Sequence, residues 1–214
     1  MTRRSRDRYG ERAAKSYRGL IDPALATLRP RVVRVCQSLG IHDVLDIACA
    51  TGAQCRALGK AGFQVTGLDL SEAMIDAAKK AGGRNVRYVQ GSAYELPFVS
   101  ASFDAAILSL ALHEHTESER RLMIDEAVRI LRPEGHLILA DYAKPQPTPI
   151  HLPWQIIRAV EYIAGPEHNA GFRDYVRRGS LRGLIDRLGM EAVVLGRSHF
   201  RAIEIAVCRI PNRR

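Results

Sequence analysis

The chain has 214 residues, of which 26% are charged and 46% are hydrophobic, and this composition is typical of a globular protein with one domain-sized core. No apolar run approaches the roughly 20 residues of a membrane span, and the arginine-rich start lacks the apolar segment of a signal peptide. We therefore expect a cytoplasmic protein without a transmembrane segment.

The net charge of +9 is unevenly distributed along the chain. Residues 1–18 contain seven basic and two acidic side chains, and we predict a separate basic arm over residues 1–19. Such an arm can bind nucleic acid or an anionic membrane surface. Aromatic residues do not alternate with the arginines as a platform for single strands would require, so a solvated arm is favoured over a nucleic-acid partner.

From residue 20 onward, strand-like and helix-like segments alternate, which predicts a mainly parallel sheet. Pro23 suits a first helical turn, so we predict a helix from Pro23 to Leu39. The predicted strands span residues 43–48, 64–69, 86–90, 104–109, 136–142, 191–198 and 202–209. The other predicted helices span residues 53–61, 117–131, 152–164 and 179–188, and one more is capped by Ser71 and ended by Gly82.

Two acidic residues stand at the ends of the first two predicted strands, Asp46 in the first and Asp69 in the second. The carboxyl edge of a parallel sheet is where such folds bind cofactors, and an acidic side chain there can accept both hydroxyl groups of a ribose. Asp69 has an alternative structural role as the cap of the next helix. The pattern favours a nucleoside-containing cofactor at this edge.

The loop after the first strand, residues 48–52, consists of small residues with a single glycine, Gly52. A nicotinamide or flavin site favours Gly-x-Gly-x-x-Gly here, because the pyrophosphate approaches the backbone closely. S-adenosylmethionine (SAM) has no pyrophosphate and requires less of this approach. The loop therefore favours SAM over a dinucleotide.

The same loop resembles the first motif of the class I SAM-dependent methyltransferases, Asp/Glu-x-Gly-x-Gly-x-Gly, with Ala48 and Ala50 in place of the first two glycines. Residues 90–98 resemble the family's run Gly-Asp-Ala-x-x-Leu-Pro-Phe, with Ser92 in place of the aspartate. The Ser-Phe-Asp sequence at 102–104 then matches the family's start of the fourth strand.

Residues 131–137 are similar to the family's Leu-Lys/Arg-Pro-Gly-Gly-x-Leu segment, with Glu134 in place of one glycine. The resemblance covers about residues 20–142, in the family's order. Within the family, the Leu-Pro-Phe run and residues 109–113 are most similar to the ubiquinone/menaquinone-biosynthesis C-methyltransferases and their small-molecule relatives.

The resemblance implies an α/β fold, in which helices flank a Rossmann-like seven-stranded sheet that is mostly parallel with its last strand antiparallel. The methyltransferase domain would span residues 20–214. Residues 150–188 would form a small helical lid over the substrate, inserted after the fifth strand.

The resemblance also implies which residues contact the donor. Asp46, Ala48 and Gly52 would border its methionine part and Asp69 its ribose. The remaining predicted cofactor-binding residues are Leu70, Ser92 and Ala93 around the adenine, together with Met74, Ser109 and Tyr17.

His113 follows the fourth strand, at the edge where an acceptor would meet the donor, and we predict it as the catalytic residue that accepts a proton. His113 and His115 alone lack the further ligands of a metal site, and we predict none. Residues 154–175 mix aromatic and polar groups as a pocket wall does, with ordinary packing as the alternative. The predicted substrate-binding residues are Tyr9, His113, Trp154, His168 and Arg173.

These observations together predict SAM-dependent methyl transfer to a small, apolar or aromatic acceptor by in-line displacement. Two alternatives stay open. The first is a nucleic-acid methyltransferase that uses the basic arm, and the second is a non-catalytic SAM-binding protein, which the missing glycines suggest. A homo-oligomer also stays open, because no feature of the sequence determines the oligomeric state.

Overall fold

The structure is a computed structural model that describes residues 10, 15, 17–145, 152–163, 165–199 and 201–209. The strands of this part of the chain form one sheet in the order β3-β2-β1-β4-β5-β7-β6. The strands are β1 (Asp43–Ile47), β2 (Gln64–Asp69), β3 (Val86–Gln90), β4 (Phe103–Ser109), β5 (Leu131–Tyr142), β6 (Ala192–Ser198) and β7 (Ile203–Arg209). The helical elements are η2 (Tyr17–Ile21), α2 (Asp22–Ala24), α3 (Arg29–Ser38), α4 (Ala53–Lys60), α5 (Glu72–Ala81), η3 (Leu112–Glu114), α6 (Glu117–Arg129), α7 (Leu152–Ile163), α8 (Pro166–Arg177) and α9 (Ser180–Arg187).

Strand pairing confirms the predicted sheet. The strands β1 to β5 pair in parallel, whereas β7 runs antiparallel to both β5 and β6. The register pairs Asp69 with Gln90 and Ser109 with Ala140, so the carboxyl ends of neighbouring strands meet at one edge. This edge is where ligands of open α/β sheets bind.

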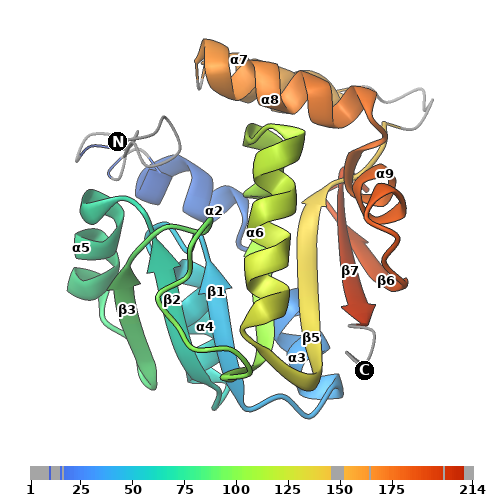
Figure 1. The fold of residues 1–214 in the computed structure, drawn as a ribbon. Coiled ribbons are helices and arrows are strands. Elements are labelled where there is room, and N and C mark those ends of the chain that lie inside the picture. Colours follow the sequence, from blue (N-terminus) through green and yellow to red (C-terminus); the bar gives the residue numbers. More distant parts are fainter. Residues whose placement is uncertain are drawn as a thin grey trace.

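Helices cover both faces of the sheet, with α6 on one face and α3 and α4 on the other (Figure 1). In the same view, α7 and α8 lie across the edge at which the parallel strands end. The core lies between the sheet and its helices, and the central strand β4 is fully buried from Ala105 to Leu108 because helices pack on both of its faces. The helices α7 and α8 belong to the segment that the sequence analysis predicts as a lid.

Two helices begin as their sequences predict. Ser71 caps α5, since its side chain accepts a hydrogen bond from the amide of Met74 at 3.3 Å. Thr116 and Glu119 form a capping box at the start of α6, in which each side chain bonds the backbone of the other. The short helix η3 ends only three residues before α6, so the capping box also fixes the position at which η3 meets α6.

The predicted helix from Pro23 to Leu39 is wrong as a single element. A short turn separates α2 from α3, and α3 begins at Arg29 with Pro30 in its first turn. Pro30 has no backbone N–H and therefore cannot continue a helix that began at Pro23, whereas it suits a new first turn. Asp22 bonds Arg29 at 2.7 Å and holds the two pieces together.

The fifth strand also differs from the prediction, because it begins at Leu131 instead of His136. Leu131 pairs with Phe103, and the register shifts before Ala105 pairs with His136. The segment between these pairs contains Pro133, which lacks an N–H and interrupts regular pairing.

The three departures from the family's glycine pattern all have a left-handed backbone. The φ angle is 58° at Ala48, 47° at Ala50 and 64° at Glu134. Glycine adopts such angles without cost, whereas another residue pays about 1–2 kcal/mol. The loop after β1 therefore has the backbone shape of a glycine-rich loop, although Ala48 and Ala50 are strained in that shape.

We expect Glu134→Gly to raise the free energy of unfolding by about 0.5–1 kcal/mol, because the relief of backbone strain exceeds the added entropy of the unfolded chain. Glu134 is exposed, so the change removes no buried contact. Urea unfolding measures the effect. Glu95→Gly, at an exposed position without a left-handed backbone, is the control and should be neutral or destabilising. A loss of stability in Glu134→Gly would contradict the prediction.

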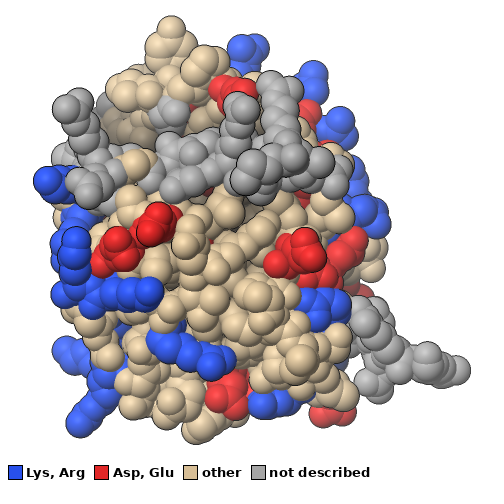
Figure 2. Space-filling model, turned by 60° about the vertical axis from the view of Figure 1, so that its left-hand side comes forward, with Lys and Arg blue, Asp and Glu red and all other residues tan. Residues whose placement is uncertain are grey.

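On the face shown in Figure 2, uncharged side chains fill most of the centre, and lysine and arginine lie mainly towards its margins. Acidic side chains lie between them, so the coloured atoms of this face form no continuous basic track. Within the part of the chain that the structure describes, no helix has the length and apolarity to cross a membrane.

Candidate active site

The loop between β1 and α4 is fixed to the end of β2 by Asp69. One oxygen of the Asp69 carboxylate accepts a hydrogen bond from the Ala50 amide at 2.8 Å, and the other accepts one from the Ser71 amide at 3.0 Å. The Cys49 amide also bonds the carbonyl of Leu68 at 2.9 Å. The cap of α5 is Ser71, so the alternative role of Asp69 as that cap is wrong, and Asp69 instead joins the predicted donor loop to the segment before α5.

A small cavity of about 30 Å³ opens beside this loop. Four predicted cofactor-binding residues come together around it, namely Tyr17, Asp46, Ala48 and Ser109. The other residues that line it are Asp22, Leu25, Leu28, Arg29, Cys49, Ala53 and Gln54. These residues place the cavity between the end of β1 and the start of α4.

The remaining predicted donor residues lie around the same edge. Gly52 packs so tightly against Tyr88 that a Cβ atom would lie 2.5 Å from the tyrosine oxygen. The carbonyl of Leu70 accepts a hydrogen bond from Gln90 at 3.2 Å, which joins the ends of β2 and β3. Ser92 lies two residues after the end of β3, and its side chain accepts a hydrogen bond from the Tyr94 amide at 3.2 Å.

Ala93 is partly buried against the core in the same segment after β3, and Met74 is buried in the first turns of α5. Neither of them lines the small cavity. Two further residues at this loop were not predicted. The Thr51 hydroxyl donates a hydrogen bond to the Asp22 carboxylate at 2.5 Å. No spacing pattern connects these two residues, so only the folded chain shows the contact.

Asp46 is buried at the end of β1, and burial raises the pKa of its carboxyl group to about 7. The Cys55 thiol donates a hydrogen bond to it at 3.1 Å and partly offsets this rise. Because the folded-state pKa lies above the unfolded value, the stabilisation from protonated Asp46 is complete at low pH and is lost as the pH rises through about 7. A cation beside Asp46 would favour the charged carboxylate.

We expect the affinity for SAM to rise on the order of tenfold between pH 5.5 and 6.5, because the positive charges of the donor stabilise ionised Asp46 and binding releases its proton. Calorimetry at the two pH values measures this, about one pH unit below the range in which an α-amino group such as that of SAM titrates. Asp46→Asn should lose the pH dependence, and Asp125→Asn, on the exposed side of α6, should keep it. An unchanged pH profile in Asp46→Asn would contradict the prediction.

On the acceptor side, five ionisable residues form a buried group that we call the imidazole–carboxylate cluster: His113, Glu114, Asp141, Glu161 and His168. The Nδ1 atom of His113 lies 3.0 Å from Asp141, and Nδ1 of His168 lies 2.9 Å from Glu114. The Nε2 atoms of both histidines face one oxygen of Glu161, at 3.6 Å for His113 and 2.6 Å for His168.

Charge pairing within the cluster shifts its pKa values strongly. Burial works to lower the pKa of His168, but Glu114 and Glu161 outweigh it and raise the value to about 9. Burial works to raise the pKa of Glu114, but His168 and the flanking histidines hold it at about 2. The pKa of His113 is raised as well, because Asp141 and Glu161 outweigh burial. The three carboxylates therefore favour positive charge between them.

Aromatic rings surround the cluster. Tyr142, at the end of β5, donates a hydrogen bond to the second oxygen of Glu161 at 2.7 Å. Its ring packs against Phe172 and Trp154, with centroid distances of 5.4 Å and 5.9 Å. Of the predicted substrate-binding residues, His113 and His168 are thus in the cluster and Trp154 is beside it.

The other two predicted substrate-binding residues lie elsewhere. Arg173 is exposed and lines a second, open cavity of about 780 Å³ between α7 and α8, whose lining does not include His113. That cavity is lined by Pro145, Trp154, Gln155, Arg158, Ala170, Phe172, Arg173, Asp174, Val176 and Arg177. Tyr9 lies outside the described residues.

The predicted sites omitted Asp141, Glu114 and Glu161, although each contacts a predicted histidine. A signal for Asp141 is present in the sequence, because it stands near the carboxyl end of β5 as Asp46 and Asp69 do on their strands. The same rule that selected those two residues selects Asp141.

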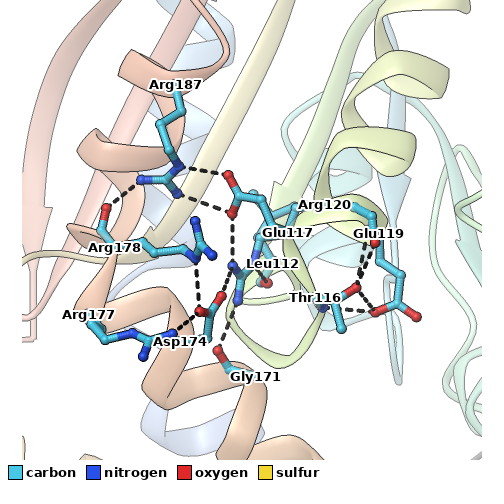
Figure 3. Close-up of polar contacts among 11 residues, drawn as sticks. Leu112, Thr116, Glu117, Glu119, Arg120, Gly171, Asp174, Arg177, Arg178 and Arg187 are labelled. Carbon is cyan, nitrogen blue, oxygen red and sulfur yellow. Dashed lines mark hydrogen bonds and ion pairs between the residues drawn. The ribbon is translucent and has the colours of Figure 1, made fainter.

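Arg120 joins α8 to η3 and so holds the two halves of the cluster together (Figure 3). Its buried guanidinium donates to the carbonyls of Leu112 and Gly171, both at 2.9 Å. It also contacts Glu117 and Asp174, each at 3.1 Å. This single side chain satisfies groups from three separate segments.

The sequence of the central part of the chain matches a known domain. Residues 45–139 match the sequence model of a methyltransferase domain. This segment, which is less than half of the chain, has the sequence pattern of a methyltransferase domain. Solved structures with a similar fold include a SAM-dependent methyltransferase and a methyltransferase with bound S-adenosylhomocysteine, which supports the predicted cofactor.

Similar proteins agree with this assignment. A demethylmenaquinone methyltransferase of Clavibacter sepedonicus is 35% identical over 124 residues, which are 57% of this chain and 49% of that protein. One from Thermotoga maritima is 33% identical over 119 residues, or 55% of this chain and 51% of that protein. The chain thus spans about half the length of the curated relatives that it matches.

Solved structures show the same fold. The crystal structure of a SAM-dependent methyltransferase from Aquifex aeolicus superimposes with a TM-score of 0.60 at 18% identity, over 95% of this chain and 100% of that one. The predicted Rossmann-like sheet is confirmed, and so is the predicted resemblance to class I methyltransferases related to the quinone-biosynthesis group.

Proposed function

We propose that the protein transfers the methyl group of SAM to a small, apolar or aromatic acceptor. The observation that carries this proposal is the arrangement at the carboxyl edge of the sheet. There the Asp69 carboxylate accepts a hydrogen bond from the Ala50 amide in a loop of small residues, two of which have a left-handed backbone. Buried Asp46 lines the cavity beside that loop. This arrangement offers a ribose acceptor and an anionic wall for the cationic end of the donor.

The acceptor class is proposed from the residues above the same edge. Tyr142, Trp154 and Phe172 pack against one another beside His113 and suit the face of an aromatic acceptor. The names of the two bacterial relatives, both demethylmenaquinone methyltransferases, support an acceptor of this kind. Methyl transfer then requires the accepting atom to be held in line with the sulfonium methyl at about 3 Å, with water excluded.

The role of His113 as a proton acceptor stays a prediction. The Asp141 carboxylate orients its ring, which favours such a role. However, its second ring nitrogen faces Glu161 in a buried cluster. The helices α7 and α8 lie across this edge of the sheet and supply Glu161 and His168, which supports a role as the substrate lid.

A methyl-transfer assay tests the proposed function. The purified chain is incubated with SAM and a panel of quinols, phenols, thiols and amines, with RNA and DNA as additional substrates, and S-adenosylhomocysteine is quantified. We expect turnover with aromatic acceptors. Turnover restricted to nucleic acid would establish the first alternative, whereas SAM binding without turnover on any substrate would establish the non-catalytic one.

A further inference from the structure

Three side chains from separate segments direct ligand atoms at one point inside the imidazole–carboxylate cluster. They are His113 from η3, Glu161 from α7 and His168 from α8, and their ligand atoms all lie within 4.8 Å of one another. His113 and Glu161 are buried, and His168 is partly buried. A point with two imidazole nitrogens and one carboxylate oxygen around it has the ligand set of a divalent transition metal.

Each of these three side chains is also held from behind. His113 and His168 both present Nδ1 to a carboxylate, that of Asp141 and that of Glu114, which leaves Nε2 of each ring turned towards Glu161. A carboxylate behind the remote nitrogen is the arrangement that orients metal-binding histidines in proteins.

Glu161 is oriented in the same way. Tyr142 donates a hydrogen bond to Oε1 at 2.7 Å, whereas the buried Oε2 receives no hydrogen bond of normal geometry even though His168 Nε2 lies 2.6 Å away. Oε2 is therefore the carboxylate atom that a cation would contact. All three ligands then have the outer partners that metal sites require.

We propose that Nε2 of His113, Nε2 of His168 and Oε2 of Glu161 bind one divalent transition-metal ion, with zinc as the ion that this ligand set fits best. Tetrahedral zinc places neighbouring ligand atoms about 3.3 Å apart, given metal–ligand bonds of about 2.0–2.1 Å. The present distances from Oε2, 2.6 Å and 3.6 Å, lie on either side of that value. In this role His113 is a ligand, which replaces its predicted role as a proton acceptor.

The spacing of His113 and His115 predicts no metal site, because the further ligands lie on α7 and α8 and not near them in sequence. A second group, His42 with Asp43 and Asp104, also brings three ligand atoms together, but it is at the surface. Asp104 there already binds Arg132 and accepts two backbone hydrogen bonds, so it is committed to other partners. We therefore use this group as a control.

Metal binding is tested on the full chain after treatment with a chelator. Calorimetry with zinc alone should show one tight site per chain, and cobalt(II) should produce the intense visible absorption of a tetrahedral nitrogen and oxygen site. Glu161→Gln and His168→Gln should each weaken zinc binding on the order of 100-fold and abolish the cobalt spectrum. Tyr142→Phe, which removes only the outer partner of Glu161, should weaken binding about 10- to 100-fold.

His42→Gln is the matched control and should bind zinc with unchanged affinity. Circular dichroism and thermal unfolding of each variant show that it is folded, and zinc should raise the melting temperature of the unmodified chain but not that of Glu161→Gln. Absence of a tight zinc site in the unmodified chain would overturn the proposal. Binding that survives in Glu161→Gln and His168→Gln but is lost in His42→Gln would also overturn it. Methyl-transfer activity is not needed for any of these readouts.

Discussion

Asp69→Ala is expected to abolish measurable binding of SAM. The carboxylate at the end of β2 is the proposed partner of the ribose hydroxyls, and charged hydrogen bonds of this kind contribute about 1.5–3 kcal/mol each. The same carboxylate fixes the Ala50 and Ser71 amides, so its removal also releases the donor loop. Together these losses predict a decrease in affinity of at least about 100-fold, measured by isothermal titration calorimetry.

Two further variants separate binding from folding. Asp69→Asn keeps one oxygen acceptor and should retain weak, measurable binding. Asp76→Ala removes an exposed carboxylate from the next helix, α5, and should bind SAM with unchanged affinity. Thermal unfolding shows whether Asp69→Ala is folded at the temperature of the titration. An unchanged affinity in folded Asp69→Ala would contradict the assignment of Asp69 to the donor.

The second large effect is expected at Arg120, whose side chain is completely buried. Arg120→Met should lower the free energy of unfolding by about 2–4 kcal/mol, because it removes the charged hydrogen bonds to the carbonyls of Leu112 and Gly171 and one of the three arginine partners of Asp174. The methionine keeps most of the volume against the Tyr175 ring, over which the guanidinium now lies at 4.9 Å. Urea unfolding measures the change.

The neighbouring Arg121→Met is the control, because Arg121 is exposed on the same helix and should change stability by less than about 0.5 kcal/mol. Arg120→Met should also make α8 exchange its amide hydrogens faster than α4, which has no contact with Arg120. Equal stability of the two variants would show that the Arg120 network does not hold α8 on η3.

Local sequence was sufficient to predict the sheet and the donor edge. Strand-length apolar segments, an acidic residue at a strand end and a loop of small residues are features of ten residues or fewer, and the parallel sheet places them together without further information. The three replaced glycines at 48, 50 and 134 lie where the backbone is left-handed, which the sequence analysis did not predict.

The first helix and the fifth strand were less accurately predicted for a local reason. Pro30 stands in the first turn of a second helix, at a position where the helical spacing of apolar residues predicts that the first helix continues. Pro133 lies within β5, in a segment whose residues do not follow the alternation of a regular strand. In both segments proline determines what the backbone can form, and the hydrophobic pattern does not show it.

The acceptor side was decided by tertiary structure. His113 and its partners Asp141, Glu161 and His168 are far apart in sequence, and they meet because η3 packs against β5 and α8, and α7 packs against α8. Gly171 permits this approach, since a Cβ atom there would lie 2.5 Å from the carbonyl oxygen of Glu114, and Arg120 then bonds both segments.

The physical reason for this difference is the range of the interactions. Strand ends and loops are specified by neighbouring residues, so the donor site that we propose could be predicted from the sequence before the fold is known. The charge and ligand arrangement of the cluster depends on contacts between helices that pack only in the folded chain, where burial strengthens each ion pair and fixes which ring nitrogen faces inward.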